Sequence, residues 1–155
     1  MTRNIFIATV LILGLASTAM AAGSSSPSRA PEPESNFDLG VKAVEAQDFN
    51  RALGLLGKVV RADPQNADAW NWIGFSNRKL KRLKVSLVAY KKALAIDPDH
   101  RGANEYLGEL YLTTGDLAKA RARLDKLDGI CFFGCEEYDD LKRAIKAFEA
   151  AQGKS

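Results

Sequence analysis

Residues 67–100 read ADAWNWIGFSNRKLKRLKVSLVAYKKALAIDPDH and contain two helical patterns separated by a basic turn. The first pattern places four residues on one helix face, at i, i+3, i+4 and i+7: Trp70, Ile73, Gly74 and Asn77. The apolar face of the second pattern follows a similar spacing: Leu83, Leu87, Tyr90 and Leu94. Asp97-Pro98 ends the second pattern, because a residue before proline avoids the helical region. The stretch therefore predicts two α-helices joined by a turn.

This helix pair belongs to a repeat with a period of 34 residues. Five columns keep one register over three units: Leu39, Ile73 and Leu107; Gly40, Gly74 and Gly108; Ala52, Ser86 and Ala120; Leu56, Tyr90 and Leu124; Val59, Ala93 and Leu127. Pro64 and Pro98, each preceded by aspartate, close the first two units. A fixed period of this length is typical of stacked helical repeats. We expect units at about 33–66, 67–100 and 101–134.

The second unit resembles the tetratricopeptide repeat (TPR) at its signature positions: Trp70, Ile73, Gly74, Tyr90, Ala93 and Pro98. The first unit departs from that pattern with Asn36 in place of the tryptophan, and the third with Phe132 in place of the closing proline. The resemblance covers about residues 33–132. It implies an all-α, TPR-like helical solenoid of three helix-turn-helix repeats, and it does not name a partner, because fold alone does not fix function.

A C-terminal capping helix is predicted over 136–151. Its apolar residues again share one face: Tyr138, Leu141, Ile145 and Phe148. An open solenoid end would expose apolar surface, which such a helix covers. Lys142 stands where Gly74 and Gly108 would be, so we expect no second helix to pack there. The TPR domain is therefore expected to span 37–151.

The N-terminal segment predicts export. Arg3 precedes an apolar run of 12 residues, and Ala19-Met20-Ala21 forms a small-x-small cleavage site, so residues 1–21 are interpreted as a cleaved signal peptide. The run is short for a spanning helix, which needs about 20 residues, and we expect no stable membrane anchor after cleavage. Residues 22–36, rich in serine and proline, are expected to form a flexible linker. The predicted location is periplasmic or secreted.

The composition argues against a nucleic-acid-binding protein, a metalloprotein and an enzyme. The chain of 155 residues carries a formal charge of +3, one histidine and two cysteines. This charge is too small to indicate a nucleic-acid partner. With so few histidines and cysteines, we predict no metal site, no cofactor and no catalytic residues, so the protein is not expected to be an enzyme. His100 falls in a turn between units, where it is expected to be solvated or to cap a helix.

The cysteine pair Cys131 and Cys135 lies in the turn before the capping helix. In an oxidising compartment two nearby thiols pair most simply in a structural disulfide. Closing so short a loop contributes about 2 kcal/mol in the chain-entropy model. The alternative is a thiol-based redox or Cu(I)-handling protein that uses this C-x3-C pair.

In TPR proteins the first helix of each unit lines a concave groove that binds peptides or helices. The resemblance assigns that groove to Phe37, Val41, Asn71, Phe75, Arg78, Lys79, Glu105 and Glu109, with Val44 and Leu112 beside them. Phe37 and Val41 occupy the places of the lysine and asparagine that chaperone-binding TPR domains use to hold a C-terminal carboxylate, which argues against such a ligand. The predicted function is a non-catalytic periplasmic module that binds a protein or peptide partner. A weaker alternative is a scaffold that self-associates through its solenoid ends.

The signal interpretation predicts that the mature protein begins at Ala22, because cleavage follows Ala19-Met20-Ala21. N-terminal sequencing of the protein from fractionated cells checks this. Intact Met1 in the cytosol would contradict both the location and the reasoning that the cysteines are oxidised.

Overall fold

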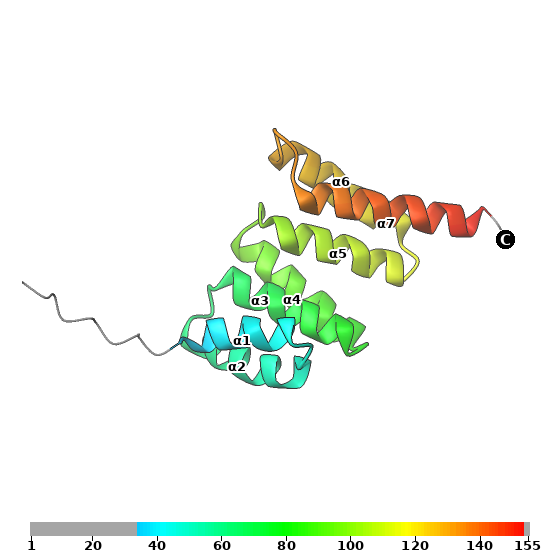
Figure 1. The fold of residues 1–155 in the computed structure, drawn as a ribbon. Helices are drawn as coiled ribbons and strands as arrows, with labels where there is room; N and C mark the ends of the chain where they lie inside the picture. The colour runs from blue at the N-terminus through cyan, green and yellow to red at the C-terminus, as the bar shows by residue number, and fades with distance from the viewer. Residues whose placement is uncertain (1–33, 154–155) are drawn as a thin grey trace, which may run out of the picture. The chain divides into compact units, whose positions relative to one another are not determined.

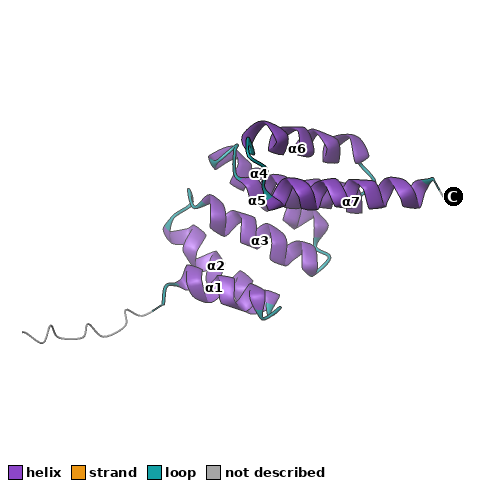
Figure 2. Ribbon diagram, turned by 45° about the horizontal axis from the view of Figure 1, so that its top comes forward, coloured by secondary structure: helices purple, strands orange, loops and turns teal. Residues whose placement is uncertain are grey.

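The computed structural model describes residues 34–153. The expected signal peptide, 1–21, and most of the expected linker lie outside the described residues. Within them the chain forms α-helices and no strand (Figures 1 and 2). The helices are α1 (Asn36–Glu45), α2 (Phe49–Ala62), α3 (Ala67–Lys79), α4 (Leu83–Ile96), α5 (Arg101–Thr113), α6 (Leu117–Ile130) and α7 (Glu136–Gln152). None of the described helices is long and apolar enough to cross a membrane.

Three antiparallel helix pairs stack in chain order, α1 with α2, α3 with α4 and α5 with α6 (Figure 1). The first helices of successive pairs also contact one another, α1 with α3 and α3 with α5. Short turns join all of these helices (Figure 2). The predicted all-α helical solenoid is thereby confirmed.

A glycine on the first helix lets each of the first two pairs pack closely. A Cβ atom added at Gly74 would lie 2.5 Å from ring carbons of Tyr90, and one at Gly40 would lie 2.8 Å from the Leu56 side chain. Tyr90 and Leu56 are both fully buried. The Ser86 hydroxyl donates a hydrogen bond of 2.7 Å to the Gly74 carbonyl, so the second helix also presents a small residue at the contact. The repeated small and large residues therefore fix the spacing of the helices.

The third unit departs from this arrangement. A Cβ atom at Gly108 would meet Leu141 of α7 at 2.6 Å, whereas Leu124, which shares the register of Leu56 and Tyr90, stays half-buried. Leu141 is fully buried and Ile145 nearly so. α7 packs on both α5 and α6. The capping helix thus supplies the large side chain that the second helix supplies in the other units.

A side-chain cap marks the start of the first helix. Asn36 is the first helical residue, and Ser35 caps α1. The Ser35 hydroxyl accepts a hydrogen bond from the Asp38 amide at 3.1 Å, and the Asp38 carboxylate accepts one from the Ser35 amide at 3.2 Å. This reciprocal capping box satisfies two amide groups of the first turn. Ser35 and Asp38 therefore define the helix start, one residue before the expected start of the TPR domain at 37.

The glycine contacts generate a paired stability prediction. Gly74→Ala forces a methyl group against the Tyr90 ring and should lower the free energy of unfolding by about 1–3 kcal/mol. Gly54, in α2, has nothing within 4 Å of its would-be Cβ atom. Gly54→Ala should therefore raise stability by about 0.5–1 kcal/mol, as alanine does in an open helix position. Denaturant unfolding measures both, and equal effects of the two changes would contradict the close contact.

Candidate functional site

A hollow of about 410 Å³ opens along the first helices of the three units. We call it the aromatic hollow. Its lining comes from α1, α2, α3, α5 and the turn after α1: Val44, Glu45, Gln47, Phe49, Trp72, Phe75, Lys79 and Tyr106. Because the lining spans three units, the hollow exists only once the repeats have stacked.

Phe75 is the centre of the aromatic cluster in this hollow. Its ring centroid lies 5.0 Å from that of Tyr106, 5.6 Å from that of Trp72 and 6.3 Å from that of Phe49. These are the tilted and edge-on contacts that aromatic rings favour. All four rings are half-buried, so each keeps part of its face in water. The hollow therefore presents a continuous, preformed aromatic surface.

Two cations border the aromatic cluster. The Arg78 guanidinium carbon lies 5.4 Å from the Phe75 centroid and 5.5 Å from the Tyr106 centroid. The Lys79 ammonium nitrogen lies 5.0 Å from the Phe75 centroid. Arg78 also forms an ion pair of 2.6 Å with Glu109, and both side chains are largely covered. Arg78 is thus held by two rings and one carboxylate, while Lys79 remains exposed.

A second hollow, of about 420 Å³, lies beyond this ion pair, and we call it the α5–α7 hollow. Its lining residues come from α3, α5 and α7: Arg78, Glu109, Leu112, Thr113, Ala144, Ala147 and Phe148. Arg78 contacts rings of the aromatic hollow and also lines this second one. The Arg78–Glu109 pair therefore lies between the aromatic hollow and a second recess of mixed apolar and polar lining.

Glu105 is a buried carboxyl beneath this surface, with 6% of the residue exposed. Burial raises the pKa of Glu105 to about 8, and the nearby carboxylates of Glu109, Asp140 and Glu137 raise it further, whereas Arg78 opposes the shift. Two of those carboxylates belong to α7, so the capping helix adds negative charge around Glu105. The Glu105 carboxyl therefore keeps its proton to a higher pH than an ordinary glutamate does.

Two protein-family models, both described as tetratricopeptide repeat, match this chain at residues 37–100 and 77–130. Together they cover all three helix pairs. The chain belongs to the tetratricopeptide repeat family.

Curated proteins are similar to this chain over much of its length. Protein FlbA of Caulobacter vibrioides is 31% identical over 123 residues, which cover 73% of this chain and 21% of FlbA. The chain spans at most about a fifth of the length of the curated relatives it matches.

Solved TPR structures share its fold at 18% sequence identity. The first TPR of Spaghetti (RPAP3), bound to the HSP90 peptide SRMEEVD, superposes with a TM-score of 0.65 over 74% of this chain and 93% of that one. PcrH, in complex with the chaperone binding region of PopD, gives a TM-score of 0.64 over 77% of this chain and 90% of that one.

The predicted groove residues of this TPR domain fall into three sets: residues that line one of the two hollows, residues of α1 that line neither, and buried residues. Phe75 and Lys79 line the aromatic hollow, and Arg78 and Glu109 line the α5–α7 hollow. Phe37 and Val41 are half-buried on α1 and line neither hollow.

Asn71 and Glu105 form the third set, because both are buried, with 4% and 6% of their surface exposed. Asn71 packs against the first turn of α5, where a Cβ atom at Gly102 would lie 3.3 Å from its side-chain nitrogen. The charged side chains that act on Glu105 come from three helices: Arg78 of α3, Glu109 of α5, and Glu137 and Asp140 of α7. The structure therefore places these two residues beneath the groove surface, where they support it without offering contact area to a ligand.

Sequence reasoning missed three aromatic residues of the hollow, Phe49, Trp72 and Tyr106. A signal was present for two of them. Trp72 and Tyr106 are 34 residues apart, and they directly precede Ile73 and Leu107 of a repeat column. An aromatic residue recurring in register beside a core column could have been assigned to the groove.

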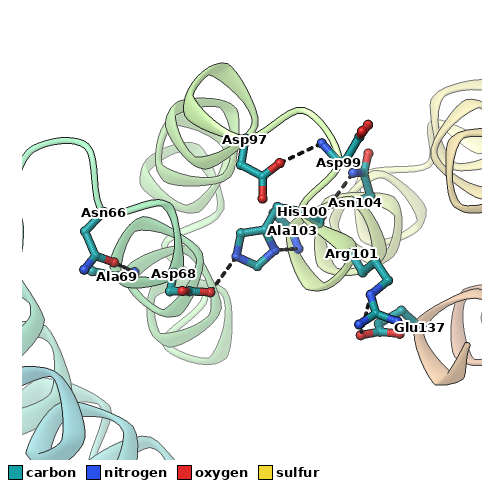
Figure 3. A network of polar contacts seen from close by, with 10 residues as sticks. All are labelled: Asn66, Asp68, Ala69, Asp97, Asp99, His100, Arg101, Ala103, Asn104 and Glu137. Carbon is teal, nitrogen blue, oxygen red and sulfur yellow. Dashed lines mark hydrogen bonds and ion pairs between the residues drawn. The ribbon is translucent and has the colours of Figure 1, made fainter. Parts of the chain in front are cut away.

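A polar cluster around His100, at the start of α5, connects α3, α5 and α7 (Figure 3). The Nδ1 atom of His100 accepts a hydrogen bond of 3.2 Å from the Ala103 amide, and His100 thereby caps α5. The Nε2 atom of His100 lies 3.1 Å from the Asp68 carboxylate of α3, and the Arg101 Nε atom lies 4.0 Å from the Glu137 carboxylate of α7. The described residues contain no group of three His, Cys, Asp or Glu side chains that could hold a metal ion. The cluster is explained by helix capping and inter-repeat contacts.

Cys131 and Cys135 are joined in a disulfide between α6 and α7, with their Cα atoms 5.6 Å apart. Neither cysteine lines the aromatic hollow or the α5–α7 hollow. The pair is therefore separate from the candidate groove.

Glu105 generates a pH prediction. Its pKa is about 8 in the fold against an ordinary value of 4.5, so the folded state holds the proton more tightly than the unfolded state. The contribution of this proton to the free energy of unfolding has its full value below pH 4.5. It is lost as the pH rises through about 8. Glu105→Gln removes the charge that must otherwise be buried. The stability of this variant relative to the parent should therefore increase with pH, by on the order of 1 kcal/mol or more.

Denaturant unfolding across that pH range measures the difference, with Glu45→Gln on the exposed end of α1 as the control. A Glu105→Gln effect that is the same at acidic and alkaline pH would contradict the raised pKa of this carboxyl.

Proposed function

We propose that this TPR domain is a non-catalytic protein-interaction module that binds a peptide or helix of a partner protein along the first helices of its repeats. The observation that carries the proposal is the aromatic hollow. Four half-buried rings from three units meet there without a covering segment among the described residues. Such a preformed concave surface, apolar with a few charged groups at its edge, is typical of binding sites.

The chemistry of the hollow favours a ligand with apolar anchors. Covering the remaining exposed faces of the rings removes apolar area from water, which contributes about 25 cal/mol per Å². Aromatic and arginine side chains are also the residues that most often dominate binding energy. A ligand that continues past Phe75 reaches Arg78 and Glu109 and then the α5–α7 hollow. A peptide with two apolar anchors separated by a polar segment fits this order.

The solved TPR neighbours support this class of ligand. RPAP3 is bound to an HSP90 peptide, and PcrH is in complex with a segment of PopD. At 18% identity the likeness establishes the fold, and the ligand class is carried to this chain as part of the proposal. Phe37 and Val41 leave the first unit without the polar pair expected for a C-terminal carboxylate. We therefore propose an internal peptide segment or a helix as the ligand.

We further propose that the domain works in the periplasm, after removal of residues 1–21. The support is the signal-like N-terminal sequence together with the Cys131–Cys135 disulfide, since disulfides persist in oxidising compartments. The partner is then an exported protein or a periplasmic segment of a membrane protein.

Replacing Phe75 and Lys79 together by alanine tests the groove. The change removes the central ring of the hollow and the cation beside it, so capture of the principal partner from periplasmic extract should fall by at least tenfold. The matched control replaces Val88 and Lys91 by alanine, an apolar and a lysine residue that are both exposed on α4. Quantitative mass spectrometry of the captured proteins measures both variants.

Phe75 is half-buried, so its removal should also cost about 1–2 kcal/mol of stability, and the melting temperature of each variant has to be recorded. If the folded groove variant captures the partner as well as the parent, the aromatic hollow is not the working surface.

A further inference from the structure

The loop between α6 and α7 exposes two adjacent phenylalanines. Phe132 is 85% exposed and Phe133 is 104% exposed, the largest apolar exposures among the described residues. The Cys131–Cys135 disulfide closes the loop at its base, and the Gly134 amide donates a hydrogen bond of 2.9 Å to the Cys131 carbonyl. Gly134 adopts a φ of 84°, which favours glycine. The result is a braced five-residue loop, the Phe–Phe loop, whose rings pack against none of the core clusters.

Unpaired acidic side chains surround this loop. Asp128 at the end of α6 and Glu136 and Asp139 at the start of α7 are all exposed, and none forms an ion pair within residues 34–153. A surface that receives the loop must therefore cover two aromatic rings and accept three negative charges. Apolar area bordered by cations meets both requirements.

The same chain carries such a surface at its α3–α4 turn. Four exposed cations there have no ion-pair partner among the described residues: Lys79, Lys81, Arg82 and Lys84. Lys79 also lines the aromatic hollow of about 410 Å³, so this basic turn begins at the hollow, whose lining contains one carboxylate, that of Glu45. The turn and the Phe–Phe loop lie at opposite ends of the helices (Figures 1 and 2). One molecule cannot bring its own loop to its own hollow.

We propose that the Phe–Phe loop of one molecule binds the aromatic hollow of a second copy, beside the α3–α4 turn. Phe132 and Phe133 enter the recess lined by Phe49, Trp72 and Phe75. Asp128, Glu136 and Asp139 face the cations of the turn. The contact joins two different surfaces, so it is heterologous and propagates into short chains or closes into a ring.

This inference rests on the proposed function, because it uses the same hollow, and it names a second copy as one occupant. A lipid surface is the less favoured destination of the loop. Anionic headgroups attract cations, and the acidic residues beside the loop are repelled by them. A partner that binds the hollow more tightly should displace the loop of the neighbouring copy.

Sedimentation velocity of the purified protein, from micromolar to millimolar concentration, tests the association. We expect a concentration-dependent increase in weight-average mass that weakens as salt is added, because the charges around the loop and at the turn are exposed. Phe132→Ser with Phe133→Ser should weaken association at least tenfold and leave the melting temperature unchanged, since these rings pack against no core cluster. Val85→Ser with Val88→Ser, exposed on α4, is the matched control and should leave association unchanged.

A charge exchange identifies the second copy as the occupant. One variant reverses the acidic side with Asp128→Lys and Glu136→Lys, and the other reverses the basic side with Arg82→Glu and Lys84→Glu. Each should be monomeric alone at concentrations where the parent associates. An equimolar mixture should restore association, because the reversed surfaces then face opposite charges.

Three results would overturn the inference. They are a parent protein that stays monomeric throughout the series, association that survives loss of both rings, and a charge-reversed mixture that fails to associate. Binding of the parent to phosphatidylcholine or phosphatidylglycerol vesicles that depends on Phe132 and Phe133, without self-association, would also overturn it in favour of a membrane role. None of these results affects the groove test, because the Phe–Phe loop lies outside the residues changed there.

Discussion

In each unit a glycine on the first helix faces a large apolar side chain, with no room for a Cβ atom between them. Gly40 meets Leu56, Gly74 meets Tyr90 and Gly108 meets Leu141. This contact sets how closely the helices approach and therefore how the first helices stack side by side. The aromatic hollow depends on it, because its lining is drawn from three units.

The third contact connects the end of the solenoid to the groove. Leu141 comes from α7, so the helix that closes the core also supplies Ala144, Ala147 and Phe148 to the α5–α7 hollow. The same packing brings the α7 carboxylates near Glu105 and raises its pKa. The helix α7 therefore completes the core and lines one side of the candidate groove. It also begins directly after the Phe–Phe loop.

The 34-residue period, the glycine column and the Asp-Pro boundaries were sufficient to predict the solenoid, because each is a local signal that recurs in register. The candidate site was predicted less completely. Phe75 and Lys79 follow from the repeat register, but Asn71 and Glu105 are buried by contacts with neighbouring units that no single unit encodes. The capping helix was predicted, but its contact with Gly108 was not, because the repeat register assigns that contact to Leu124 and the structure gives it to Leu141.

Trp72 offers the most direct measurement of whether ligands bind along the first helices. The chain contains two tryptophans, and Trp70→Phe leaves Trp72, which lines the aromatic hollow, as the single indole. Addition of the captured partner should move the Trp72 emission to shorter wavelength and saturate with the binding curve, because a ligand in the hollow removes the indole from water. A partner that binds with the same affinity and leaves the Trp72 emission unchanged would contradict the assignment of this surface.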